Sequence, residues 1–82
     1  MTKAKMSLTS DQQLAIKKLL PQVRKFLSPQ YSDKFLTEAL SEAFRSGNVG
    51  GIIKIEYFSL GTTEGIRVQE GFHHEYFVVE KR

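Results

Sequence analysis

The chain has 82 residues, of which 40% are hydrophobic and 26% are charged, and its formal net charge is +3. This length fits one domain, and the balance of apolar and charged residues is typical of a globular protein rather than a disordered one. The sequence contains no cysteine, which excludes a disulfide framework, a thiolate zinc site and cysteine catalysis. No apolar run approaches the ~18–20 residues of a membrane-spanning helix.

The N-terminal third predicts a leader followed by an amphipathic helix. We expect residues 1–8 to form a flexible leader and residues 9–82 to form a single α+β domain. The stretch Thr9–Gln13 carries the hydroxyl and amide side chains of a capping box, and apolar residues then recur at helical spacing as far as Leu27. Pro21 falls inside this run and predicts a kink or a break; because the apolar phase continues through it, we favour a kink.

A second helix follows the Ser28-Pro29 dipeptide. It begins either at Pro29 or after Ser32, both of which are good starting signals, and it ends with Gly47 as the left-handed cap. The glycine-rich segment 47–51 is interpreted as a flexible connection. A phosphate-binding loop would need the opposite order, with a strand before the glycines and a helix after them.

From Gly50 onward the hydrophobic period changes from 3.6 to 2, which indicates strands. The predicted strands lie at about residues 53–58, 66–70 and 74–80. Residues 61–65 are expected to form a hairpin loop, and Gly71 a turn or bulge. The predicted fold class is therefore α+β, with two N-terminal helices packed on a three-stranded antiparallel β-meander (α-α-β-β-β).

The tripeptide His73-His74-Glu75 is the one cluster of candidate metal ligands or acid–base groups. On a strand, His73 and Glu75 share one face and His74 points to the other. A divalent metal needs three or four ligands, so one face falls short. We therefore expect ordinary surface residues, no catalytic residue, no metal and no cofactor. An enzyme using His73 and Glu75 ranks third among the hypotheses.

Basic residues are concentrated at the start of the chain, where residues 1–27 hold six basic side chains and one acidic side chain. Lys17, Lys18, Arg24 and Lys25 fall on the back of the first helix, opposite its apolar stripe. They predict either an ordinary solvated helix face or a contact with an anion such as a phosphate backbone.

Apolar residues on both faces of the strands predict a protein interface. If the helices cover one sheet face, the other face still carries an apolar patch, and exposed patches of this kind mark partner sites. The alternative is a curled sheet whose two sides are both covered within one chain. The candidate partner-binding residues are Ile52, Phe58, Leu60, Tyr76 and Val78.

Together these patterns predict a non-enzymatic protein-interaction or regulatory module that binds a protein partner. We expect a cytoplasmic homodimer that associates through its sheet, without a membrane contact. The alternative is a small nucleic-acid-binding protein that places the basic face of its first helix on the phosphate backbone, with an affinity that falls steeply with salt.

Overall fold

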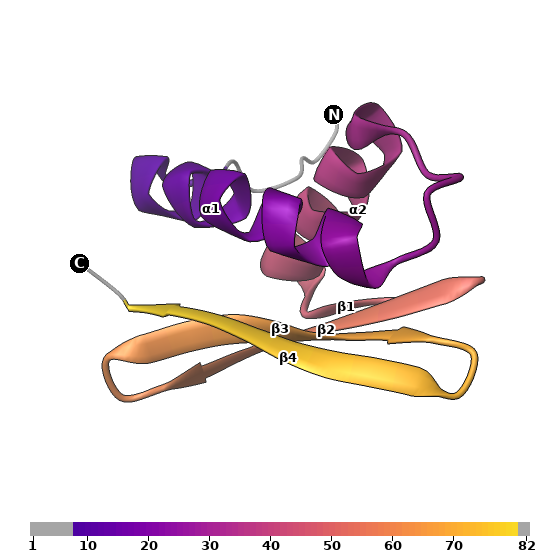
Figure 1. The fold of residues 1–82 in the computed structure, drawn as a ribbon. Helices are drawn as coiled ribbons and strands as arrows, with labels where there is room; N and C mark the ends of the chain where they lie inside the picture. The colour runs from indigo at the N-terminus through magenta and orange to yellow at the C-terminus, as the bar shows by residue number, and fades with distance from the viewer. Residues whose placement is uncertain (1–7, 81–82) are drawn as a thin grey trace, which may run out of the picture.

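The computed structural model describes residues 8–80, which form two helices over one face of an antiparallel sheet (Figure 1). The elements are α1 (Ser10–Phe26), α2 (Asp33–Ser46), β1 (Asn48–Val49), β2 (Ile53–Leu60), β3 (Thr63–Glu70) and β4 (His73–Glu80). The strand order β1-β2-β3-β4 follows the sequence. The predicted α+β class is confirmed, and residues 1–7 of the predicted leader lie outside the described residues.

Helix α1 begins at the predicted capping box. The Gln12 amide donates to the Thr9 hydroxyl oxygen at 3.0 Å, and the Thr9 amide donates to the Gln12 side chain at 2.9 Å, so two free helix-end donors are satisfied. The helix includes Pro21 in its interior and does not break there. Leu8, the last residue of the predicted leader, is half-buried and packs against the core.

Helix α2 begins at the later of its two predicted starts. Ser32 is the N-cap, and its hydroxyl oxygen accepts from the Phe35 amide at 3.1 Å. At the other end, Gly47 adopts φ 99° and donates its amide to the Ala43 carbonyl at 2.8 Å. A left-handed cap of this kind favours glycine, which has no Cβ to clash.

The prediction of three strands was wrong, because the chain that leaves α2 forms a fourth. Asn48 and Val49 pair antiparallel with Glu56 and Ile55 of β2. The left-handed turn at Gly47 folds the chain back onto β2, where the Gly47 carbonyl accepts from the Tyr57 amide at 2.9 Å. Two residues are too few to show a strand period, so the sequence pattern missed β1.

The first hairpin is tighter than the predicted loop over residues 61–65. Leu60 pairs with Thr63, which leaves a two-residue turn. Gly61 has φ 58°, the positive value that the first position of a two-residue hairpin turn requires. Gly71, with φ 62°, starts the next hairpin in the same way. As a result β3 begins at Thr63 and contains Gly65, which the prediction placed in the loop.

The core lies between the two helices and the sheet face below them (Figure 1). Alternate residues of β2 and β3 point into it, as expected for pleated strands. The largest fully buried side chains are Leu19, Val23, Leu36, Leu40, Ile55, Ile66 and Val68. Within residues 8–80, no helix is both long and apolar enough to span a bilayer.

The end of β3 holds the connection between the helices in place. The Glu70 carboxylate accepts from the Ser28 amide at 3.1 Å, from the Ser28 hydroxyl at 2.8 Å and from the Tyr31 hydroxyl at 3.2 Å. The Ser28 hydroxyl bond is the main reason that the pKa of Glu70 is below its usual value, although desolvation opposes the change. Glu70 therefore ties the helix layer to the sheet as a carboxylate.

A buried carboxylate lies in the same sheet face nearer the start of β3. Glu64 is 7% exposed and accepts from the Tyr57 hydroxyl at 2.7 Å. Burial is the largest cause that raises the pKa of Tyr57 above its usual value, and the hydrogen bond and charge of Glu64 raise it further. The bond satisfies a polar group that would be costly to bury alone.

Candidate protein-interaction surface

The sheet face opposite the helices carries a cluster of apolar side chains, which we call the outer-face patch. It consists of Phe58, Leu60, Tyr76 and Val78, all candidate partner residues. Cross-strand neighbours in a sheet point to the same side, and the register places Phe58, Gly65 and Val78 in one row across β2, β3 and β4. Tyr76 and Leu60 belong to the rows on either side of it, so the four side chains share one face of the sheet over three neighbouring rows.

The centre of the outer-face patch is Gly65, which the sequence reasoning did not identify. A Cβ at this position would collide with the Phe77 carbonyl oxygen and lie 2.9 Å from Val78 Cγ1 and 3.0 Å from Phe58 Cζ. The missing side chain leaves room for the Phe58 ring to lean over β3. That ring meets Tyr76 of β4 edge-on, with ring centroids 6.1 Å apart.

The outer-face patch is open to solvent. Leu60 is 71% exposed, Tyr76 58% and Val78 52%, and both described helices lie on the other side of the sheet (Figure 1). The Arg67–Glu56 ion pair, with 3.6 Å between Nη1 and Oε1, borders the patch in the row of Tyr76. An apolar centre with a charged border is the composition expected of a protein interface.

Ile52, the fifth candidate partner residue, lies apart from the outer-face patch. It precedes β2 and lines a hollow of about 370 Å³ with Phe35 and Val49, on the side of the molecule where α2 begins. Ile52 is 82% exposed, and Phe72, at the tip of the hairpin between β3 and β4, is fully exposed. The alternation of residues in β2 predicts the same face for Ile52 as for Phe58, but the bend at the start of the strand ends that alternation.

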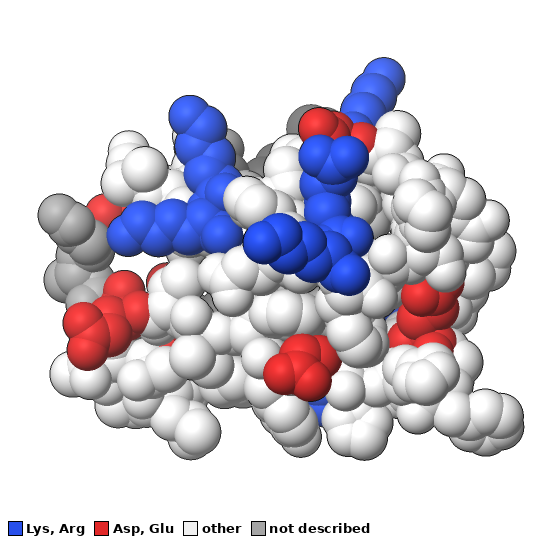
Figure 2. Space-filling model, in the orientation of Figure 1, with Lys and Arg blue, Asp and Glu red and all other residues white. Residues whose placement is uncertain are grey.

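The four candidate anion-binding residues Lys17, Lys18, Arg24 and Lys25 are exposed along α1. Figure 2 shows Lys and Arg side chains gathered over the helices, while most acidic side chains on this side lie lower, over the sheet. Arg24 is paired with Asp33 at 3.0 Å between Nε and Oδ1. Within residues 8–80, the three lysines have no ion pair with an acidic side chain.

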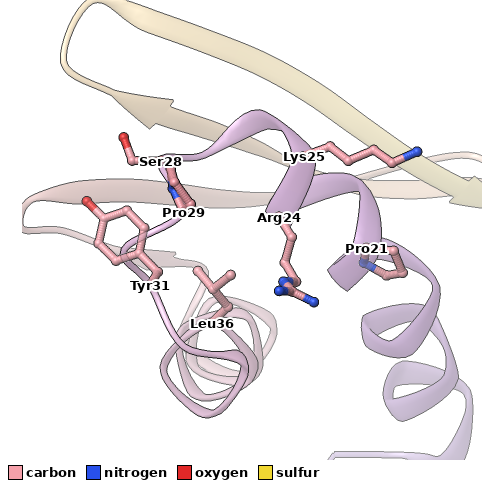
Figure 3. A pocket seen from close by; sticks show the side chains of 7 residues that line it. All are labelled: Pro21, Arg24, Lys25, Ser28, Pro29, Tyr31 and Leu36. Carbon is pink, nitrogen blue, oxygen red and sulfur yellow. The ribbon is translucent and has the colours of Figure 1, made fainter.

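A hollow of about 340 Å³ adjoins the end of α1 (Figure 3). Its wall includes Arg24, Lys25, Ser28 and Tyr31. Ser28 and Tyr31 already donate to Glu70, and Arg24 is paired. In Figure 3 Lys25 extends away from Tyr31. The polar groups of this hollow therefore do not converge on one point, as an anion site would require.

The two histidines lie on opposite faces of β4, as predicted. His73 is on the helix side, in the row of Glu70, and its charge also helps to lower the pKa of Glu70. His74 is on the outer face, edge-on to Tyr76 with centroids 6.4 Å apart. Among residues 8–80, no group of three or more histidine or acidic side chains is arranged to hold a metal ion.

Compared with known proteins, the chain matches no family model, no curated protein and no solved structure.

Proposed function

We propose that this protein is a non-enzymatic interaction module that binds a protein partner through the outer-face patch. The observation that carries the proposal is the exposure of Leu60, Tyr76 and Val78 on a sheet face that no described element covers. Burying such side chains against a partner is favourable by roughly 25 cal/mol per Å² of apolar surface. The proposal includes a cytoplasmic location and association of two copies through their sheets, so that the second copy and the other partner compete for the same patch.

The geometry supports a protein partner at this face better than a nucleic acid. Sheets that bind RNA present aromatic rings to the bases and basic side chains to the phosphates. Here the outer face has aromatic rings, but Arg67 in the row of Tyr76 is already paired with Glu56, and Glu80 lies in the row of Leu60. A paired arginine offers little charge to a phosphate chain and Glu80 would repel it, whereas a protein interface tolerates charges of either sign at its rim.

The test is affinity capture from a lysate of the source cells, with nuclease added, using wild-type protein and two single variants. Leu60→Lys places a charge in the outer-face patch, and Ile52→Lys makes the same kind of change at another exposed site outside it. We expect a protein that is captured by wild type and by Ile52→Lys and lost with Leu60→Lys. Equal capture by all three would contradict the proposal.

The second candidate is binding to a phosphate backbone through α1. It is favoured by one observation, the exposure of Lys17, Lys18 and Lys25 without an acidic partner among the described residues. Counterion release predicts that such binding falls steeply with salt. A Lys17→Glu, Lys18→Glu double variant should abolish it, while Leu60→Lys should leave it unchanged. Binding to a random-sequence DNA duplex, measured by anisotropy across a salt series, tests this.

A further inference from the structure

The outer face of the sheet is three strands wide apart from the two-residue β1, and β3 runs along its middle. Residues paired across antiparallel strands point to the same side, so this face carries rows of side chains. From one end of the strands to the other, the rows are Leu60-Thr63-Glu80, Phe58-Gly65-Val78, Glu56-Arg67-Tyr76 and Lys54-Gln69-His74. The outer-face patch lies in the first three rows, and basic groups lie in the last two.

Two copies can stack these faces in two ways if their strands stay within about 30° of each other, as they commonly do in packed sheets. A two-fold axis parallel to the strands places β3 on β3, and β2 on β4 of the second copy. A two-fold axis that crosses the strands places every strand on its own counterpart and reverses the order of the rows. The two arrangements bring different side chains together, so the charges of the face distinguish them.

Charge disfavours the axis parallel to the strands. With that axis on β3, where the two faces overlap most, Arg67 lies opposite Arg67 of the second copy. In the next row, Lys54 lies opposite His74 of the second copy. Phe58 and Val78 do meet in this arrangement, but two facing guanidinium groups oppose the association.

An axis across the strands separates these like charges. When it passes between the row of Val78 and the row of Tyr76, each Tyr76 ring lies on Val78 of the other copy. Arg67 then lies opposite Gly65, which the Phe58 ring covers. The guanidinium therefore meets an aromatic ring, which is a favourable contact, instead of its own counterpart.

The end rows also match in this arrangement. Leu60 lies opposite Lys54 of the second copy, whose aliphatic stem covers apolar surface while its ammonium group stays in water. Glu80 lies opposite His74 of the second copy, so a carboxylate meets an imidazole and not a like charge. A lysine introduced by Leu60→Lys would face Lys54 and be repelled, as expected of a change that breaks the dimer.

We propose that two copies of this chain stack their outer-face patches about a two-fold axis that crosses the strands, so that β4 lies on β4 and the ends of the two sheets are reversed. A two-fold contact of this kind uses the same residues on both copies. The arrangement rests on the association proposed above, because it uses the same outer-face patch, and it adds the orientation of the second copy.

Pairing of two copies along the open edge of β4 is disfavoured by the helix above that strand. No described strand pairs with the outer side of β4, but α1 packs mainly on this strand, where the rings of Phe26 and Phe77 meet with centroids 5.9 Å apart. Paired strands lie about 4.8 Å apart, whereas packed helices need about 8–10 Å between their axes. Two α1 helices would therefore crowd each other above β4 strands joined edge to edge.

Distances between spin labels test the orientation, because the chain has no cysteine and one introduced cysteine carries one label. Thr62→Cys labels the turn between β2 and β3, and Phe72→Cys labels the turn between β3 and β4; both sites are exposed and lie outside the outer-face patch. With the sheets reversed, matching labels of the two copies should lie about 30 Å apart for Thr62→Cys and about 35 Å apart for Phe72→Cys, from about 3.4 Å per residue along the strands and about 10 Å between the sheets. With the axis parallel to the strands, both distances should be about 10–15 Å.

Pulsed electron paramagnetic resonance at high protein concentration measures both distances. Leu60→Lys in the labelled chains should abolish them, and Lys18→Glu, on α1, should preserve them. Short distances that disappear with Leu60→Lys would overturn the orientation and leave the outer-face patch as the contact. Distances that persist with Leu60→Lys, or no distance between copies in the otherwise wild-type chain, would overturn the orientation together with the association proposed above.

Discussion

At the residue scale, Gly65 determines the shape of the outer-face patch. Its missing side chain lets the Phe58 ring cross β3 and reach Tyr76. A glycine inside a strand is normally unfavourable, because it packs nothing and loses more chain entropy than other residues. Here an aromatic neighbour covers the glycine, and the covering ring becomes part of the exposed apolar surface.

Gly65→Ala should destabilise the fold by about 1–3 kcal/mol. The new methyl group would meet the carbonyl oxygen of Phe77 and could be accommodated only by a shift of β4. Gly50→Ala is the control, since nothing lies within 4 Å of a Cβ there and its φ is not positive. Urea unfolding measures both, and equal stabilities of the two variants would show that the two strands are not this close.

Glu70 is the residue whose ionisation should affect stability at acid pH. Its folded pKa is below its ordinary value of 4.5, chiefly through the Ser28 hydroxyl. A carboxyl group whose pKa is lower in the folded chain than in the unfolded chain stabilises the fold at pH values above its unfolded pKa. This contribution is lost as the pH falls through the folded pKa. The free energy of unfolding should therefore drop below about pH 4.5.

The variant Glu70→Gln should be less stable at neutral pH and should lose less stability than wild type on acidification. Urea unfolding at a series of pH values measures this. Glu38→Gln, a change of the same group on the exposed side of α2, controls for the altered net charge. An acid dependence that is identical in wild type and Glu70→Gln would contradict the role given to the Ser28 and Tyr31 bonds.

At the element scale, signals local in the sequence were enough to predict the two helices. The strand that these signals missed, β1, depends on pairing with residues further along the chain. The capping box at Thr9 and the left-handed cap at Gly47 depend on neighbours in sequence, and both occur as predicted. Strand β1 exists only because it meets Glu56 and Ile55 of β2. A short pairing of this kind leaves no period in the sequence.

For the candidate surface, the sequence predicted which side chains share a face of the sheet but not which face is exposed. Alternation along the strands placed Tyr76 and Val78 on one face, but both faces are apolar, so the pattern could not show which one the helices cover. The role of Gly65 depends on Phe58, seven residues earlier, and on Val78, thirteen residues later, and both become its neighbours only through the register of the sheet.

Pro21→Ala should stabilise the protein by about 1–2 kcal/mol. The substitution restores one main-chain hydrogen bond inside α1 and removes the ring clash, while the greater freedom of the unfolded chain offsets part of the gain. Gln22→Ala, at the next exposed position of the same helix, should be nearly neutral. Thermal unfolding measures both, and a Pro21→Ala variant less stable than wild type would show that the proline fits the helix without cost.

At the scale of the whole molecule, the fold separates its surfaces by layer. The helix layer carries the basic side chains, and the sheet layer carries the outer-face patch and the open edge of β4 (Figures 1 and 2). Face-to-face packing of two sheets leaves the α1 helices on opposite outer sides, away from each other. Association of two copies should therefore occur through the outer faces rather than along β4.

Light scattering at high protein concentration should give the mass of a dimer for wild type. Leu60→Lys, which introduces a charge into the outer-face patch, should shift the mass towards the monomer. Lys18→Glu, on α1, should leave the dimer intact. A wild-type monomer at every concentration would remove dimerisation from the proposed function, and a dimer that persists with Leu60→Lys would place the contact elsewhere.

The most direct test of the account is a methyl NMR spectrum of labelled protein, recorded before and after addition of the protein captured from the lysate. The account predicts shifts or broadening at the Leu60 and Val78 methyl groups of the outer-face patch. The methyl groups of Leu14 on α1 and of Ile52 at the start of β2, which are also exposed, should remain unchanged. Changes confined to Leu14 or Ile52 would contradict the central claim that this protein binds its partner through the outer face of its sheet.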